Sequence, residues 1–184
     1  MKAKIIFITL SIFIAGKFTS PLSAQAEVIG KKVTLSDFHK LTVEDNITLV
    51  LYTGNQPGLS IEGSPGEVES VIVQQQGDEL VIRRGRNSSK QEPITVYVVT
   101  KNLTDLIVAD NASVKCDDVL HADVLSVLHT GTGSVNLKSD ASIVRTVSSD
   151  HGRIVVEGNY ANLVSHLDCY NRMIVVYSKE KSAS

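Results

Sequence analysis

The second half of the chain repeats itself about every twenty residues, and this repeat constrains the fold more than any other feature. Four segments align, 105–116, 126–137, 145–156 and 165–176, at offsets of 21, 19 and 20 residues. The period is too short for a pair of helices, and Val, Ile and Leu are frequent in the segments, which favours strands. The repeat therefore predicts about four stacked coils of a β-solenoid over residues 102–177.

Four columns of this alignment stay apolar and form the expected core. They are Leu103, Val124, Ile143 and Leu163; Ile107, Leu128, Val147 and Leu167; Val114, Val135, Ile154 and Ile174; and Cys116, Leu137, Val156 and Val176. The second and third columns are seven residues apart, so an unbroken strand would turn the third column outward. We therefore expect a bend between these two columns.

The bend coincides with the segment from His129 to Leu137, whose Gly-x-Gly pattern could also be read as a phosphate-binding loop. A phosphate loop leads into the N-terminus of a helix, whose free amides bind the anion. This segment leads instead into the strand pattern Val135-x-Leu137. We interpret Gly131 and Gly133 as corner residues, which need either a positive φ or room for a close backbone.

Residues 33–100 show strand patterns without the repeat. Bursts such as Ile47-x-Leu49-x-Leu51 alternate with period two, which predicts an antiparallel or mixed β region that covers one end of the solenoid. The charged tail, 179–184, is expected to cover the other end. Within 64–73, Pro65 could open a single helical turn, or a strand could begin at Val71. The prediction is one all-β domain over residues 27–184.

The N-terminus predicts export. Lys2 and Lys4 precede an apolar run of eleven residues, and the polar stretch after it ends in the small-x-small pattern Ala24-Gln25-Ala26. We interpret residues 1–26 as a cleaved Sec-type signal peptide; an uncleaved anchor is the alternative, although the run is too short to span a bilayer. We expect the mature chain in the periplasm, at the cell surface or outside the cell, with no transmembrane segment.

The charge balance argues against nucleic acid as a partner. Without residues 1–26, the chain keeps 15 basic and 20 acidic residues, a net charge of about −5. Nucleic-acid binding depends on basic groups that neutralise phosphates. The small basic cluster Arg83, Arg84, Arg86 and Lys90 lies beside turn residues, and we interpret it as a solvated loop.

Two cysteines in an exported chain raise the possibility of a disulfide. In the aligned repeat Cys116 belongs to the first coil and Cys169 to the fourth, which separates them by about 14 Å along the stack. A disulfide allows at most about 7 Å between Cα atoms. We therefore predict two free thiols.

Five segments carry a resemblance to a known family: DFHKLTVEDNITLVLYTG, LSIEG, GDELVIR, ITVYVVTKNLTDLIVADNASV and GTGSVNL. Over residues 32–177 the chain resembles the GIN-type head domain of putative auto-transporter adhesins, a family of secreted proteins from Bacteroidetes-type bacteria. The resemblance implies a right-handed, β-helix-like all-β fold and export. It carries over no catalytic or binding residues. The chain departs from the family pattern in two ways: only one coil keeps a full Gly-x-Gly, and Asn171-Arg172 replaces glycine in the last coil.

Two groups of residues are candidates for chemical sites. Val108, His129, Ser148 and Asp168 share a stripe, but Ser148 would lie between His129 and Asp168, whereas a catalytic triad needs the imidazole between the other two groups. We interpret these residues as a polar surface stripe. Asp110, Asp117, Asp118, Asp150 and His151 match no zinc or calcium spacing and are interpreted as turn residues. We predict no catalytic residues, metal or cofactor.

The hypothesis for function is a non-catalytic, adhesin-like binding module of the cell envelope, with a glycan or a surface protein as partner. A periplasmic structural or stress-related protein-interaction domain is the first alternative, and a carbohydrate-active β-helix enzyme the second. The repeated corner predicts a polar edge for binding, formed by Asp110, Thr132, His151, Tyr170 and Asn171. Such a ladder suits a repetitive ligand because many weak contacts add through avidity.

Overall fold

The computed structural model describes residues 29–85, 94–149, 151–158, 162–167 and 175–178, and most of these residues lie in β-strands. The all-β prediction is confirmed. The elements are β1 (Ile29–Thr34), β2 (Lys40–Val43), β3 (Ile47–Thr53), β4 (Gly58–Gly63), α1 (Pro65–Ser70), β5 (Val71–Gln76), β6 (Glu79–Arg84), β7 (Ile94–Thr100), β8 (Asp105–Asp110), β9 (Ser113–Leu120), β10 (Val124–Gly131), β11 (Ser134–Ser139), β12 (Ile143–Ser149), β13 (Arg153–Gly158), β14 (Asn162–Leu167) and β15 (Val175–Ser178). Among the described residues, no helix is long and apolar enough to cross a membrane.

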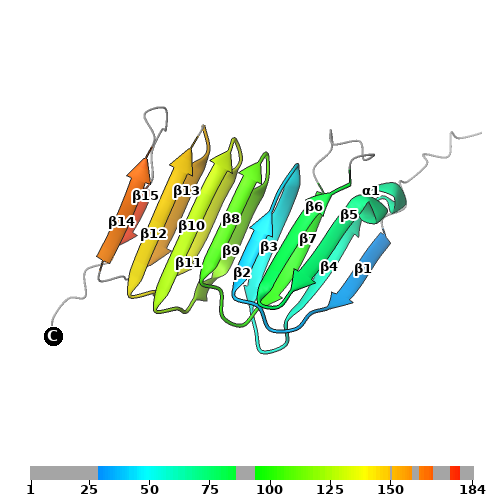
Figure 1. The fold of residues 1–184 in the computed structure, drawn as a ribbon, viewed down its shortest axis with the longest axis horizontal. Helices are drawn as coiled ribbons and strands as arrows, with labels where there is room; N and C mark the ends of the chain where they lie inside the picture. The colour runs from blue at the N-terminus through cyan, green and yellow to red at the C-terminus, as the bar shows by residue number, and fades with distance from the viewer. Residues whose placement is uncertain (1–28, 86–93, 150, 159–161, 168–174, 179–184) are drawn as a thin grey trace, which may run out of the picture.

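The strands form two mixed sheets that lie face to face (Figure 1). One sheet has eight strands in the order β1-β4-β7-β3-β9-β11-β13-β15, and the other has seven in the order β14-β12-β10-β8-β2-β6-β5. From β8 to β15 the chain alternates between the sheets, and each strand pairs in parallel with the strand two positions later in the chain. The offsets of 21 and 19 residues match this pairing, while β14 pairs with β12 at an offset of 19 rather than 20.

The N-terminal half is more regular than its sequence indicates. β2 lies between β6 and β8, and β3 between β7 and β9, with parallel pairing in all four cases. These strands continue the stack of the repeating half, whereas β1, β4 and β5 pair in antiparallel fashion. The prediction of a mixed region is therefore right, but that region is largely an extension of the stack.

In the seven-stranded sheet, the side chains that face the core are not the predicted ones. The buried rows are Leu106 with Val127 and Thr146, and Val108 with His129 and Ser148. The predicted core row, Ile107, Leu128 and Val147, points outward because neighbours on a strand face opposite sides. Similarly, Leu125 and Val144 are buried instead of Val124 and Ile143.

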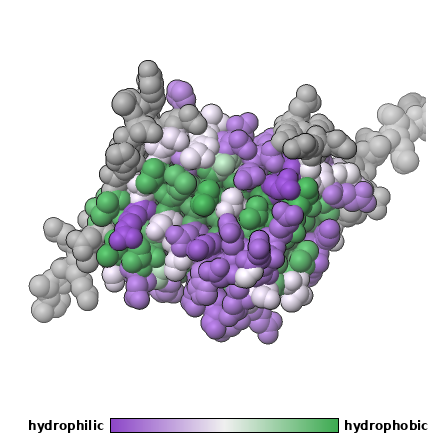
Figure 2. Space-filling model, viewed as in Figure 1, coloured by the Kyte–Doolittle hydropathy of each residue, from purple (hydrophilic) through white to green (hydrophobic). Residues whose placement is uncertain are grey.

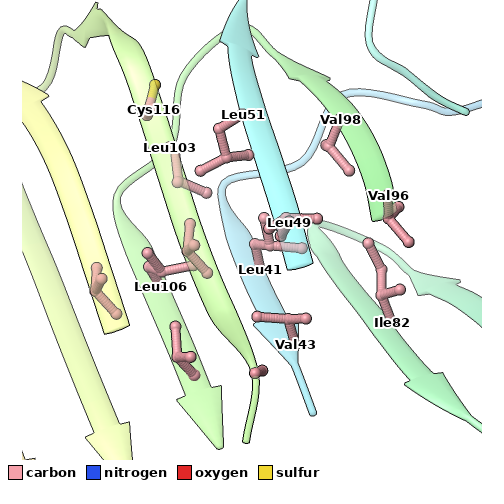
Figure 3. Close-up of a cluster of buried hydrophobic side chains, with 14 of the residues drawn as sticks. Leu41, Val43, Leu49, Leu51, Ile82, Val96, Val98, Leu103, Leu106 and Cys116 are labelled. Atoms are coloured by element: carbon pink, nitrogen blue, oxygen red, sulfur yellow. The ribbon is translucent and has the colours of Figure 1, made fainter. Parts of the chain in front are cut away.

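In the eight-stranded sheet the predicted rows are right. Val114, Val135 and Ile154 are buried, as are Cys116, Leu137 and Val156. The core between the sheets is continuous with that of the N-terminal strands, where Leu41, Leu49 and Val96 pack into it (Figure 3). The side chains of Leu167, Ile174 and Val176 lie outside the described residues.

The short helix α1 lies at the end of the stack that carries β1, β4 and β5 (Figure 1). Pro65 starts it, and a strand follows at once from Val71, so both readings of 64–73 are right. Val68 is buried, and Glu67 forms an ion pair with Arg84, whose side chain is fully buried. The interpretation of Arg84 as part of a solvated loop is therefore wrong: its guanidinium bonds the helix to the stack. Arg86 and Lys90 lie outside the described residues.

Candidate functional site

The predicted polar edge corresponds to a row of tight corners between the two sheets. At the corner after β8, Asp110 has φ 57°, and at the equivalent corner after β2, Asp45 has φ 64°. Each aspartate side chain bonds a neighbouring corner: Asp45 accepts from the amide of Arg84 at 2.8 Å, and Asp110 from the amide of Asp45 at 3.3 Å. These carboxylates therefore hold successive corners together.

The Gly-x-Gly segment lies at the next corner of the same row. The carbonyl of Asp110 accepts a hydrogen bond from the amide of Thr132 at 2.8 Å and lies against Gly131. A Cβ on Gly131 would overlap that carbonyl, and one on Gly133 would overlap the carbonyl of Ala112. Both glycines have negative or extended φ, so they are present because two backbones approach closely. The interpretation as corner glycines is correct.

The structure brings together part of the predicted edge. Thr132 is exposed, and its hydroxyl donates to the Asn111 side chain at 2.8 Å. His151 is exposed two residues before β13. Tyr170 and Asn171 lie outside the described residues, so the aromatic member that would anchor a ligand is not placed.

The stripe of His129 and Ser148 faces the core and not the solvent. Both residues are buried, and Gly152 lies against the imidazole, since a Cβ there would overlap the ring of His129. The interpretation as a polar surface stripe is therefore wrong for these residues and for Val108; Asp168 lies outside the described residues. A buried imidazole without access for a substrate cannot act as a surface base.

The acidic residues considered as metal ligands bond other groups, and Asp117 and Asp118 lie on β9, so their interpretation as turn residues is wrong. The Asp118 carboxylate accepts from the amide of Thr53 at 2.9 Å, and Asp117 pairs with Lys115 at 2.6 Å. In the described part of the chain, no three His, Cys, Asp or Glu side chains converge as a metal site. Asp150 lies outside that part.

Cys116 packs in the core as a free thiol. Burial raises the pKa of this thiol to about 11, and the thiol donates to the carbonyl of Asp118 at 3.4 Å. The thiolate needed for nucleophilic chemistry is therefore scarce at neutral pH. Cys169 lies outside the described residues, and the absence of a disulfide between the two stays a prediction.

Sequence reasoning missed a different surface, an apolar row on the outer face of the seven-stranded sheet. Ile107, Leu128 and Val147 stand side by side on β8, β10 and β12, directly paired in register. They line a depression of about 360 Å³. Figure 2 shows apolar side chains gathered over these strands.

A charged row borders this depression along the same strands. It runs in register through Glu79, Lys40, Asp105, Ser126 and Arg145. Val147 is 40% exposed, so a β-branched apolar side chain remains in water on the second strand from one edge of the sheet. The signal in the sequence was the pair of adjacent apolar columns, 106 with 107 and 127 with 128, only one of which can face inward.

A family model described as putative auto-transporter adhesin, head GIN domain, matches residues 37–168. Among solved structures, a putative adhesin from Parabacteroides merdae is 18% identical with a TM-score of 0.64, over 76% of this chain and 60% of that one. A structure from Parabacteroides distasonis, called a putative lipid binding protein, is 15% identical with a TM-score of 0.67, over 78% and 63%. No curated protein matches the sequence.

Because the sequence identities are low, these structural similarities show a shared fold alone. The chain spans about three fifths of the length of both structures. A further putative adhesin from Parabacteroides distasonis is 12% identical with a TM-score of 0.53, over 74% of this chain and 70% of that one.

Proposed function

We propose, from the premise that the chain belongs to the family of putative auto-transporter adhesins with a head GIN domain, that it is an exported, non-catalytic binding module. It acts in the cell envelope or at the cell surface and holds a surface protein as its partner. Its paired strands form a short right-handed β-solenoid whose outer faces are the binding surfaces.

The apolar row carries this proposal. A sheet face that contacts only water usually carries polar residues. The outer face here instead carries apolar residues side by side on three adjacent strands, Ile107, Leu128 and Val147. An apolar centre with a charged rim is the usual arrangement of a protein–protein interface. Burying a whole side chain of this size contributes about 1.5–3 kcal/mol. Because these three are already half-buried, we expect about 1 kcal/mol from each.

We propose two other functions on weaker physical grounds. The polar edge of Asp110, Thr132 and His151 could bind a glycan, although the Asp110 carboxylate already bonds the neighbouring corner. The same apolar row would also serve a periplasmic protein-interaction domain. Location separates that alternative from adhesion: protease added to intact cells removes a surface adhesin and leaves a periplasmic protein intact.

Attachment of the purified chain to defined surfaces tests the proposal. Plates would be coated with fibronectin, with mucin and with intact cells of the producing bacterium, and bound protein measured across a concentration series. We expect attachment to at least one coating. The triple variant Ile107→Thr, Leu128→Thr and Val147→Thr places a β-branched side chain, which suits a strand, at each position. It should attach at least about tenfold more weakly, which corresponds to about 1.4 kcal/mol.

Val119→Thr is the matched control, because Val119 is 40% exposed, as Val147 is, but lies on β9 of the other sheet. It should attach as the wild type does. Wild-type protein that attaches to none of the coatings would contradict the proposal, and so would a triple variant that folds and attaches normally.

A further inference from the structure

The outer face of the eight-stranded sheet carries a stacked aromatic pair. Tyr52 on β3 and Tyr97 on the neighbouring parallel strand β7 have ring centroids 6.5 Å apart and ring planes inclined by 19°. These values fall within the offset-stacked geometry that aromatic rings prefer. Tyr52 is 44% exposed, so part of its ring meets solvent although its neighbour supports it.

Tyr97 is held in place from the side opposite Tyr52. Its hydroxyl donates to the Glu62 carboxylate on β4, and this bond, with the negative charge, raises the pKa of the phenol. Ser60 lies directly across from Tyr97 in the strand register. Because Tyr97 is fixed and Tyr52 stacks on it, the exposed ring is ordered before a ligand arrives, and less entropy is lost on binding.

Polar groups stand beside the exposed ring on the third strand of this face. Lys115 on β9 pairs in register with Val50, two residues before Tyr52, and its ammonium contacts the Asp117 carboxylate at 2.6 Å. Both side chains are more than half exposed. The ammonium lowers the pKa of Asp117, so the carboxylate stays charged and can accept hydrogen bonds. An ordered aromatic ring is thus bordered by a donor and an acceptor.

We propose that Tyr52, Lys115 and Asp117 form a saccharide-binding site on this face, with Tyr97 and Glu62 as its support. The apolar C–H face of a sugar ring would cover the Tyr52 ring, while sugar hydroxyls accept from Lys115 and donate to Asp117. The charged groups around this position are the ammoniums of Lys115 and Lys138 and the carboxylates of Glu62, Asp117 and Asp118. Their net negative charge favours a neutral sugar over a sulfated or sialylated one. The inference rests on the proposed function only in that export brings the protein to envelope and surface glycans.

Saccharide arrays measure this directly. The purified chain would be applied to neutral oligosaccharides of glucose, mannose, galactose and N-acetylglucosamine, and to sialylated and sulfated counterparts. We expect binding to neutral members. Tyr52→Val, which suits a strand, should bind about tenfold more weakly, whereas Tyr52→Phe keeps the ring and should stay within about twofold of wild type. Asp117→Asn provides a second variant that leaves the aromatic pair intact, with an expected loss of about threefold.

Folding is followed through tyrosine emission, which can be recorded alone because the chain has no Trp. Saccharide binding equal in wild type and a folded Tyr52→Val would overturn the site, as would a wild type that binds no saccharide or only the charged ones. Loss of attachment to fibronectin by Tyr52→Val, without saccharide binding, would identify a protein contact instead and also overturn it. The apolar-row variant Leu128→Thr should bind saccharides normally, so failure here and failure of the proposed function are distinguishable.

Discussion

Replacing Gly131 by alanine tests whether close backbone approach explains the Gly-x-Gly segment. The added Cβ would overlap the carbonyl of Asp110, which is fixed because it accepts from the amide of Thr132. Overpacking costs about 1–3 kcal/mol, and displacing the carbonyl would also remove a hydrogen bond of about 1 kcal/mol. The reduced freedom of the unfolded chain offsets about 0.4–1 kcal/mol. We expect a net loss of about 2 kcal/mol.

Urea unfolding followed by circular dichroism measures this loss, and thermal unfolding should show a Tm about 4–8 °C lower. Gly66→Ala is the control, because an added Cβ there meets no atom within 4 Å and Gly66 lies inside α1. The control should be neutral or up to about 1 kcal/mol more stable. A free energy of unfolding for Gly131→Ala within about 0.5 kcal/mol of wild type would refute the explanation.

Other variants test the direction of side chains and the buried charges. Leu106→Ala should lower the free energy of unfolding in urea by about 2–5 kcal/mol, and Ile107→Ala should lower it clearly less. A larger loss at Ile107 would show that Ile107 faces the core, as the sequence predicted. Glu67→Gln removes one carboxylate that pairs with the buried Arg84 guanidinium and should cost about 3 kcal/mol. An unchanged unfolding midpoint would show that this ion pair is dispensable. Because the pKa of Cys116 is raised to about 11, the folded state keeps the proton longer, so unfolding free energy should fall as pH rises from about 9 to 11. The unfolding free energy of Cys116→Ala should fall less steeply with pH. Equal slopes for the variant and the wild type would contradict the raised pKa of Cys116.

The sequence was informative where each strand has one apolar face. In the eight-stranded sheet Lys115 and Asn136 alternate with buried residues, so the inward rows were identified correctly. In the seven-stranded sheet both faces of β8 and β10 are apolar, and periodicity could not choose between Leu106 and Ile107. That ambiguity had a physical cause: the outer row is apolar too.

Long-range pairing was beyond sequence reasoning at two further places. β2 and β3 lack the twenty-residue spacing because β4, α1 and β5 intervene before β6 and β7, so their membership in the stack was hidden. Tyr52 and Tyr97 become neighbours only through the pairing of β3 with β7. The corner glycines, in contrast, could be interpreted locally because a strand follows them.

Photo-crosslinking in the producing cells tests the binding role of the apolar row most directly. A photoreactive residue would replace Val147 on the outer face of β12 or, as the comparison, Val119 on β9. We expect a discrete crosslinked partner from position 147 whose yield falls when Leu128→Thr is added, and no product from position 119. No product at 147, or the same products at both positions, would contradict it.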